Sequence, residues 1–234
     1  MQQLDPSEKE RVPRADERNN SLGETHTLNI RRYARYTAFW GREADTVFHP
    51  TDCFDPHIDV FRFPPVEARW FLKRWITPAY RQYVYITGGM SDAPILGAAS
   101  EAPRLRTELT AYADRIYKNR AADADMIAWW LHFLASAPFR SPEEGIFFNV
   151  GHTFSTGEPL MPDSHMTGFL FSVTPSVEMR RLCSCTVHAQ VVLHVVPISD
   201  GERQLAKEDP QRLIDYFEEH GIEPVFDLDR KPYV

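Results

Sequence analysis

The chain has 234 residues, of which 43% are hydrophobic and 25% are charged, with 18 prolines and 11 glycines. This composition is typical of one globular domain, and it excludes collagen, coiled coils and a wholly disordered protein. The net charge of -7 argues against direct nucleic-acid binding, which requires a basic face. No apolar run approaches the ~20 residues that a membrane-spanning helix needs, so we expect no membrane contact.

The first 24 residues contain charges of both signs and few large apolar side chains, among them Leu4, Val12 and Leu22. They lack the apolar core of a secretory signal and differ from a transit peptide, which predicts a cytoplasmic location. Such a segment cannot recover the entropy cost of ordering its backbone. We therefore predict a disordered lead over residues 1–24 and a single domain over residues 25–234.

The predicted elements begin with an amphipathic helix over residues 25–42, where apolar residues recur at helical spacing. Aromatic and β-branched runs, ended by Pro64 and by Gly88, predict strands over residues 57–63 and 83–87. These strands indicate that a sheet follows the first helix.

Alternating side chains next predict a strand over residues 106–113, with Glu108 on its half-exposed face. A broad apolar stripe predicts a helix over residues 123–137 that Pro138 ends. Because Trp129 and Trp130 are adjacent, we expect one of the two rings to leave the buried stripe of this helix.

The remainder of the chain is predicted to form three strands and a final helix. The strands span residues 146–150, 168–173 and 186–196, and the helix begins at Asp209-Pro210 and ends at Gly221. The order of elements is not the strict alternation of a parallel doubly wound fold. It predicts a single-domain α+β fold with a central mixed, largely antiparallel sheet and helices packed on it.

The familiar catalytic motifs are absent from the sequence: it has no phosphate loop, nucleophile elbow, zincin helix or dinucleotide fingerprint. Polar residues gather instead in two turns, over residues 88–94 and 151–165. In the first turn, glycines and capping side chains predict a tight structural turn. Turns held by a rigid sheet also commonly carry binding residues, so a contact role is compatible with that structure.

Histidines and aspartates offer the other candidate chemistry. His152, Asp163 and His165 have the residue types for general acid–base work or metal binding, although the sequence does not show that they converge. His57 and Asp59, two apart on a predicted strand, face one side and could begin a metal site.

The pair His188 and His194 on another strand offers the same possibility. We interpret both strand pairs as hydrogen-bonded polar groups on a wet face. The sequence therefore predicts no catalytic residue, no metal and no cofactor.

Several short segments, in this order and spacing, resemble the suppressor of fused domain family. They are His57-Ile58-Asp59-Val60, Phe63-Pro64-Pro65, Thr87-Gly88-Gly89-Met90-Ser91-Asp92, Gly151-His152-Thr153, Gly157-Glu158-Pro159-Leu160 and Pro162-Asp163. The resemblance extends from about Val47 to the tail at Pro232. Residues 66–80 resemble an insertion, and residues 148–150 stand where family members commonly show a nearby tryptophan.

The resemblance implies a protein-binding α+β module without a cofactor, not an enzyme. Animal members join this domain to a second one and clamp a transcription factor between them, and 234 residues leave no room for that second domain. We therefore expect the stand-alone bacterial type. Such relatives are linked with polymorphic toxin systems, which implies an immunity protein that binds and neutralises a cognate toxin.

Two other functions are carried as alternatives. One is a regulatory scaffold that binds an endogenous protein, and the other is a hydrolase that uses His152, Asp163 and His165. A toxin-like partner would separate immunity from the scaffold, and convergence of these three side chains in an open pocket would favour the hydrolase.

The residues predicted to contact a protein partner lie on the two turns and near the C-terminus. They are Gly88, Gly89, Met90, Ser91, Asp92, Gly151, His152, Thr153 and Asp163, with Glu218 and Glu219 as steering charges. Residues 199–234 carry ten acidic against five basic side chains. A negative patch of this kind speeds encounter with a basic toxin domain.

Overall fold

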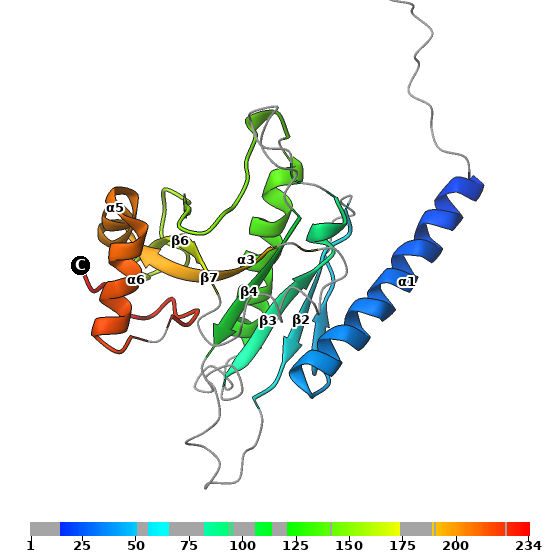
Figure 1. The fold of residues 1–234 in the computed structure, drawn as a ribbon, viewed down its shortest axis with the longest axis horizontal. Coiled ribbons are helices and arrows are strands. Elements are labelled where there is room, and N and C mark those ends of the chain that lie inside the picture. The colour runs from blue at the N-terminus through cyan, green and yellow to red at the C-terminus, as the bar shows by residue number, and fades with distance from the viewer. Residues whose placement is uncertain are drawn as a thin grey trace, which may run out of the picture.

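A computed structural model of the chain describes residues 15–50, 56–65, 82–93, 95, 106–113, 121–140, 142–173, 189, 191–222 and 224–234. These residues form one seven-stranded sheet with helices on both faces (Figure 1). None of the helices in the described ranges combines the length and hydropathy that a bilayer crossing needs.

The sheet has the strand order β1-β2-β3-β4-β7-β6-β5. Its strands are β1 (Thr46–Phe48), β2 (Asp59–Phe63), β3 (Tyr83–Gly88), β4 (Thr107–Ala113), β5 (Thr153–Ser155), β6 (Met166–Ser172) and β7 (Val191–Ser199). Neighbouring strands are antiparallel except β4 and β7, which run parallel with Thr107 opposite Val191. The predicted α+β class with a mixed, largely antiparallel sheet is confirmed.

Two long helices cover opposite faces of the β2-β3-β4 half of the sheet. They are α1 (Ala15–Trp40) and α3 (Ala121–Arg140). Side chains alternate across a strand, so Val60 of β2 packs with the α3 core while Phe61 and Phe63 pack with the α1 core. On the α1 side, Tyr36 and Trp40 are fully buried against these phenylalanines. The centre of the sheet therefore has no wet face.

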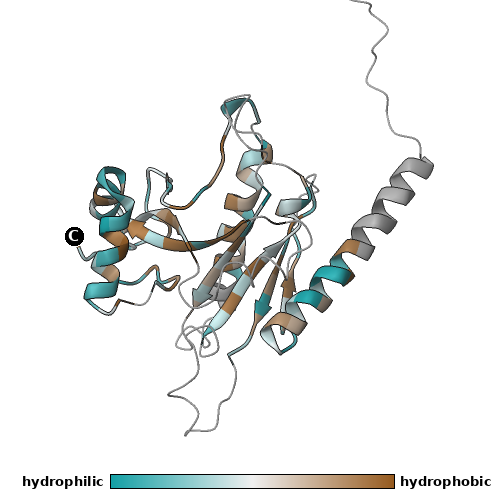
Figure 2. Ribbon diagram, viewed as in Figure 1, coloured by the Kyte–Doolittle hydropathy of each residue, from teal (hydrophilic) through white to brown (hydrophobic). Residues whose placement is uncertain are grey.

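Two short helices, α5 (Asp200–Glu208) and α6 (Pro210–Glu219), pack against the β6-β7 half. Figure 2 shows hydrophobic residues concentrated on the strands and mixed with hydrophilic ones along these helices. Ser199 begins α5 with a capping box, since its hydroxyl accepts from the backbone N–H of Glu202 while Glu202 accepts from the backbone N–H of Ser199. Asp209 caps α6 as Asp209-Pro210 predicts, and the helix ends before Gly221.

Several predicted boundaries differ from the structure. Helix α1 begins at Ala15, inside the segment expected to be disordered, whereas residues 1–14 lie outside the described ones. Helix α3 continues through Pro138 to Arg140. Strand β1 and helix α5 were not predicted, because β1 has only three residues and α5 carries mostly polar side chains. Neither segment shows the repeated apolar spacing from which a strand or a helix is predicted.

The strand predicted over residues 146–150 is wrong. Only Phe148 of this segment is a buried hydrophobic residue, and Val150 is exposed. Gly145 and Gly151, at φ 62° and 83°, place turns at both ends. The short strand forms later, at Thr153–Ser155, where the sequence predicted a turn.

The predicted half-exposed and wet faces of two strands are also wrong. Glu108 is fully buried because α1 covers the outer face of β4. His194 of β7 is fully buried as well, with Nε2 placed 2.6 Å from the Pro224 carbonyl, and burial lowers its pKa to about 4. Its proposed partner His188 lies outside the described residues.

Candidate functional site

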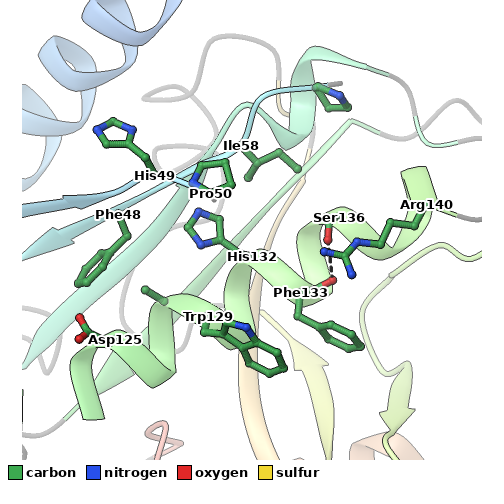
Figure 3. A pocket seen from close by; sticks show the side chains of 12 residues that line it. Phe48, His49, Pro50, Ile58, Asp125, Trp129, His132, Phe133, Ser136 and Arg140 are labelled. Atoms are coloured by element: carbon green, nitrogen blue, oxygen red, sulfur yellow. Dashed lines mark hydrogen bonds between the residues drawn. The ribbon is translucent and has the colours of Figure 1, made fainter. Parts of the chain in front are cut away.

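A surface cavity of about 560 Å³ opens between α3 and the ends of β1 and β2 (Figure 3). It is lined by Phe48, His49, Pro50, Pro56, Ile58, Asp125, Ala128, Trp129, His132, Phe133, Ser136 and Arg140. The α3 residues recur every three or four positions, so they form one face of the helix. This face of α3 lies next to the apolar stripe that the sequence predicted for residues 123–137.

An aromatic surface borders this cavity on α3. Trp129 is 55% exposed, whereas its neighbour Trp130 is buried, which confirms that one ring leaves the stripe. The Trp129 ring stacks on Phe133 with a centroid separation of 5.5 Å, and the Arg140 guanidinium lies 5.9 Å from the Phe133 centroid. We call Trp129, Phe133 and Arg140 the Trp129 surface; indole, phenyl and guanidinium groups are enriched at protein interfaces.

A cluster of two histidines and an aspartate lies where β1 ends and β2 begins, and His49 is the member of it that lines the cavity. His49 follows β1, His57 precedes β2 and Asp59 is the first residue of β2. The Asp59 Oδ1 atom lies 2.8 Å from His49 Nδ1 and 3.0 Å from His57 Nε2. These hydrogen bonds confirm that His57 and Asp59 share a side, but Asp59 is buried and does not lie on a wet face.

A fourth ionisable side chain of this region, His132, belongs to α3. Burial lowers the pKa of His132, and the charge of Asp59 only partly opposes that effect. Among the described residues, its Nε2 atom has no hydrogen-bond partner. His132 is therefore a neutral imidazole at neutral pH, and its Nε2 atom is buried.

The first predicted turn, over residues 88–92, is mostly interior. Gly88, Gly89, Met90 and Ser91 are buried, and Met90–Asp92 form the short helix η2. The Oε1 atom of Glu108 accepts from the backbone N–H groups of Gly89 and Ser91, each at 3.1 Å, and from the Ser91 hydroxyl at 2.6 Å. Buried donors therefore converge on one buried carboxylate beneath the turn.

Arginines fix the outer side of the same turn. Buried Arg32 of α1 forms an ion pair with Asp92, and Arg106 donates to the carbonyls of Ser91 and Asp92 at 2.7 Å. Asp92 is the one partly exposed residue of residues 88–92. The structure thus describes the tight structural turn, and partner contact through these residues stays a prediction.

The second predicted loop is held by backbone bonds. Gly151, at φ 83°, donates to the Phe171 carbonyl at 2.7 Å, and the Phe171 N–H donates to the His152 carbonyl at 2.9 Å. Thr153 begins β5 opposite Leu170 of β6. This loop therefore extends the sheet past β6.

The three side chains of the hydrolase alternative are not brought together. The His152 ring packs edge-on against Phe147, while Asp163 and His165 are exposed. Within the described ranges, no hydrogen bond or ion pair joins any two of the three, and the one His/Asp cluster with metal-ligand spacing is that of His49, His57 and Asp59. The geometry gives the hydrolase no support.

The predicted steering charges Glu218 and Glu219 are exposed on α6. Helix α6 packs on β6 and β7, whereas the cavity adjoins β1 and β2 at the other end of the strand order (Figure 1). The two predicted steering charges therefore lie away from the cavity. Their contribution to binding stays a prediction.

The sequence analysis missed the cavity itself. His49, His132 and Arg140 were not among the predicted site residues. A second helical stripe through Trp129, His132 and Phe133, offset from the apolar stripe, carries the signal that could have revealed this face.

Residues 55–231 match the family model for the suppressor of fused protein. The chain belongs to the suppressor of fused family. The match covers β2 to the C-terminal tail, while α1, β1 and His49 precede it. A search of curated protein sequences gave no significant match.

Two solved structures share this suppressor of fused fold. A suppressor of fused homologue from Neisseria gonorrhoeae is 21% identical, with a TM-score of 0.58 over 89% of this chain and 98% of that chain. A chain from the Sufu–Fu complex is 12% identical, with a TM-score of 0.57 over 87% of this chain and 90% of that chain. The expected family and fold are confirmed.

Proposed function

We propose that this chain is a protein-binding module whose partner is a cognate toxin domain, which makes it an immunity protein. The main support for a binding role is the Trp129 surface, an exposed aromatic stack beside a cavity of about 560 Å³. Family membership supports a binding role, because a solved relative is named as a complex of Sufu with Fu.

A partner that covers the Trp129 surface removes its apolar area from water, and this favours binding. An indole that is 55% exposed and stacked on Phe133 presents rigid apolar area that a partner can cover at a small entropy cost. Arg140 adds a cation beside the same rings, suited to a carboxylate or carbonyl of the partner. The cavity next to them has room for one or two partner side chains.

The charge of the chain favours a basic partner. The net charge is -7, and exposed Glu218 and Glu219 lie on α6, away from the Trp129 surface. Such charges at a distance from the contact raise the rate of encounter more than they lower the rate of dissociation. We therefore assign them to steering.

Reversing both steering charges, with Glu218→Lys and Glu219→Lys together, is expected to slow partner association about fivefold at low ionic strength. The dissociation rate should stay nearly constant, because neither side chain lies in the proposed contact. The measurement is association and dissociation kinetics at two salt concentrations. The Glu218→Gln/Glu219→Gln pair, which removes half as much charge, should give a smaller slowing, and an unchanged association rate for both pairs would remove these residues from the account.

The experiment that tests the immunity role has two steps. The tagged protein is used to capture its partner from lysate of the source cells, and the partner is then expressed alone or together with this chain. Growth arrest by the partner alone and rescue by co-expression would support immunity. Recovery of an endogenous housekeeping protein that does not arrest growth would favour the regulatory scaffold instead.

A further inference from the structure

Three metal-ligand atoms converge where β1 ends and β2 begins. His49 Nδ1, His57 Nε2 and a carboxylate oxygen of Asp59 all lie within 4.8 Å of one another. The two nitrogens are 2.8 and 3.0 Å from Asp59 Oδ1. Ligands of a tetrahedral Zn²⁺ ion, with bonds of about 2.0–2.1 Å, lie roughly 3.3 Å apart, so the two nitrogen–oxygen distances lie within about half an ångström of that spacing.

The charge at the cluster favours a cation. Asp59 is 1% exposed, and across the described part of the chain it has no Lys or Arg partner. Its two imidazole partners carry a charge only when protonated. Because a buried carboxylate is costly without a compensating charge, a bound dication would stabilise Asp59.

The donor types select the class of ion. Two imidazole nitrogens and one carboxylate suit Zn²⁺ and similar first-row divalent ions, whereas Mg²⁺ and Ca²⁺ prefer all-oxygen sites. Structural zinc sites are closed by four protein ligands, while sites with three protein ligands keep an open position. This cluster is of the second kind.

The surroundings provide both access and rigidity. The His49 side chain is 67% exposed and lines the cavity, and the His57 side chain is 35% exposed (Figure 3). Asp59 is held in the β2 ladder opposite Gly88, and a Cβ added at Gly89 would lie 2.0 Å from the His57 carbonyl oxygen, so the two backbone segments are closely packed. Fixed backbone at two of the three ligands lowers the cost of assembling a site.

We propose that His49, His57 and Asp59 bind a divalent transition-metal ion of the Zn²⁺ class, with an open coordination position beside the exposed His49 side chain. This inference is independent of the proposed toxin partner. The metal would stabilise the pairing of β1 with β2 and offer a position for a partner ligand.

The test uses the full-length protein, stripped of metal with a chelator and then titrated with Zn²⁺ by calorimetry and with Co²⁺ by visible absorption. We expect one ion per chain, with micromolar or tighter affinity, and the intense visible bands of a low-coordinate Co²⁺ complex. His49→Ala, which removes an exposed side chain, should weaken binding roughly a hundredfold without unfolding the protein. His57→Ala should have a similar effect.

The matched control is His165→Ala, which removes an exposed imidazole outside the cavity and should leave the affinity unchanged. Failure to bind either ion below millimolar concentration would overturn the proposal and leave the cluster as a hydrogen-bonded carboxylate. Equal affinity of the wild type and His49→Ala would also overturn it, since binding would then come from scattered surface histidines.

Discussion

Replacing Glu108 with alanine is expected to lower the free energy of unfolding by about 4 kcal/mol. The side chain is fully buried, and its two oxygens accept from the Gly89 and Ser91 backbones, the Ser91 hydroxyl and the Thr87 hydroxyl. Alanine leaves the two backbone N–H groups and the Ser91 hydroxyl buried without an acceptor and opens a cavity. Chemical denaturation with guanidinium, followed by tryptophan fluorescence, measures the change.

Glu108→Gln is the matched control, because an amide keeps the volume and the Oε1 acceptor. We expect it to cost about 1 kcal/mol, since the donors from Gly89 and Ser91 retain their partner. A cost for Glu108→Ala that is as small as that for Glu108→Gln would contradict the view that this carboxylate organises the turn.

The same pair of proteins gives a pH test. Burial raises the pKa of Glu108, and hydrogen bonds from Ser91 and Thr87 with the charge of Arg32 only partly oppose it. Between the ordinary value of 4.5 and the higher folded value, the folded chain therefore binds more protons than the unfolded chain. The contribution of this group to stability falls as pH rises through that interval, so Glu108→Gln should be least costly above it.

Gly89→Ala is expected to destabilise the protein by about 3 kcal/mol. Gly89 has φ 122°, a conformation that L side chains rarely adopt, and an added Cβ would lie 2.0 Å from the His57 carbonyl oxygen. Because the clashing atom belongs to the backbone, the chain at His57, just before β2, would have to move. Thermal and chemical denaturation of the variant measure the loss.

Gly157→Ala provides the control for conformation alone. Gly157 also has a positive φ, 75°, but an added Cβ would meet nothing within 4 Å. We expect a cost of about 1 kcal/mol there. Equal costs at both positions would show that the close approach to His57 contributes nothing.

The sequence was sufficient for the elements with strong periodicity. The α3 stripe, the β2 and β3 runs and the Asp209-Pro210 helix start each repeat one local signal several times, and the structure has all of them. Strand β1, with three residues, and the polar helix α5 offer no such repetition. Their places are set by pairing with β2 and by capping at Ser199, which are tertiary and local contacts rather than periodic ones.

The candidate site was harder to predict for a physical reason. Whether Glu108 is exposed depends on α1, which is far away in sequence and covers the outer face of β4. In the same way, His49 meets Asp59 only because β1 and β2 are paired antiparallel. Side chains that converge through such pairings carry no common spacing in the sequence, whereas the adjacent Trp129 and Trp130 did indicate an exposed ring.

The Trp129 surface is the proposed contact with the protein partner. The most direct measurement is affinity capture from source-cell lysate with the wild type, Trp129→Ala and Ile30→Ala in parallel, quantified by mass spectrometry. Ile30 is 57% exposed on α1 and serves as the matched control, because its removal takes apolar area from another face.

We predict that the wild type and Ile30→Ala recover one protein in near-stoichiometric amounts, while Trp129→Ala, equally folded, binds it about thirtyfold more weakly, as expected for a loss of roughly 2 kcal/mol at an interface tryptophan. Equal recovery by all three proteins would contradict the claim and place the contact elsewhere on the fold.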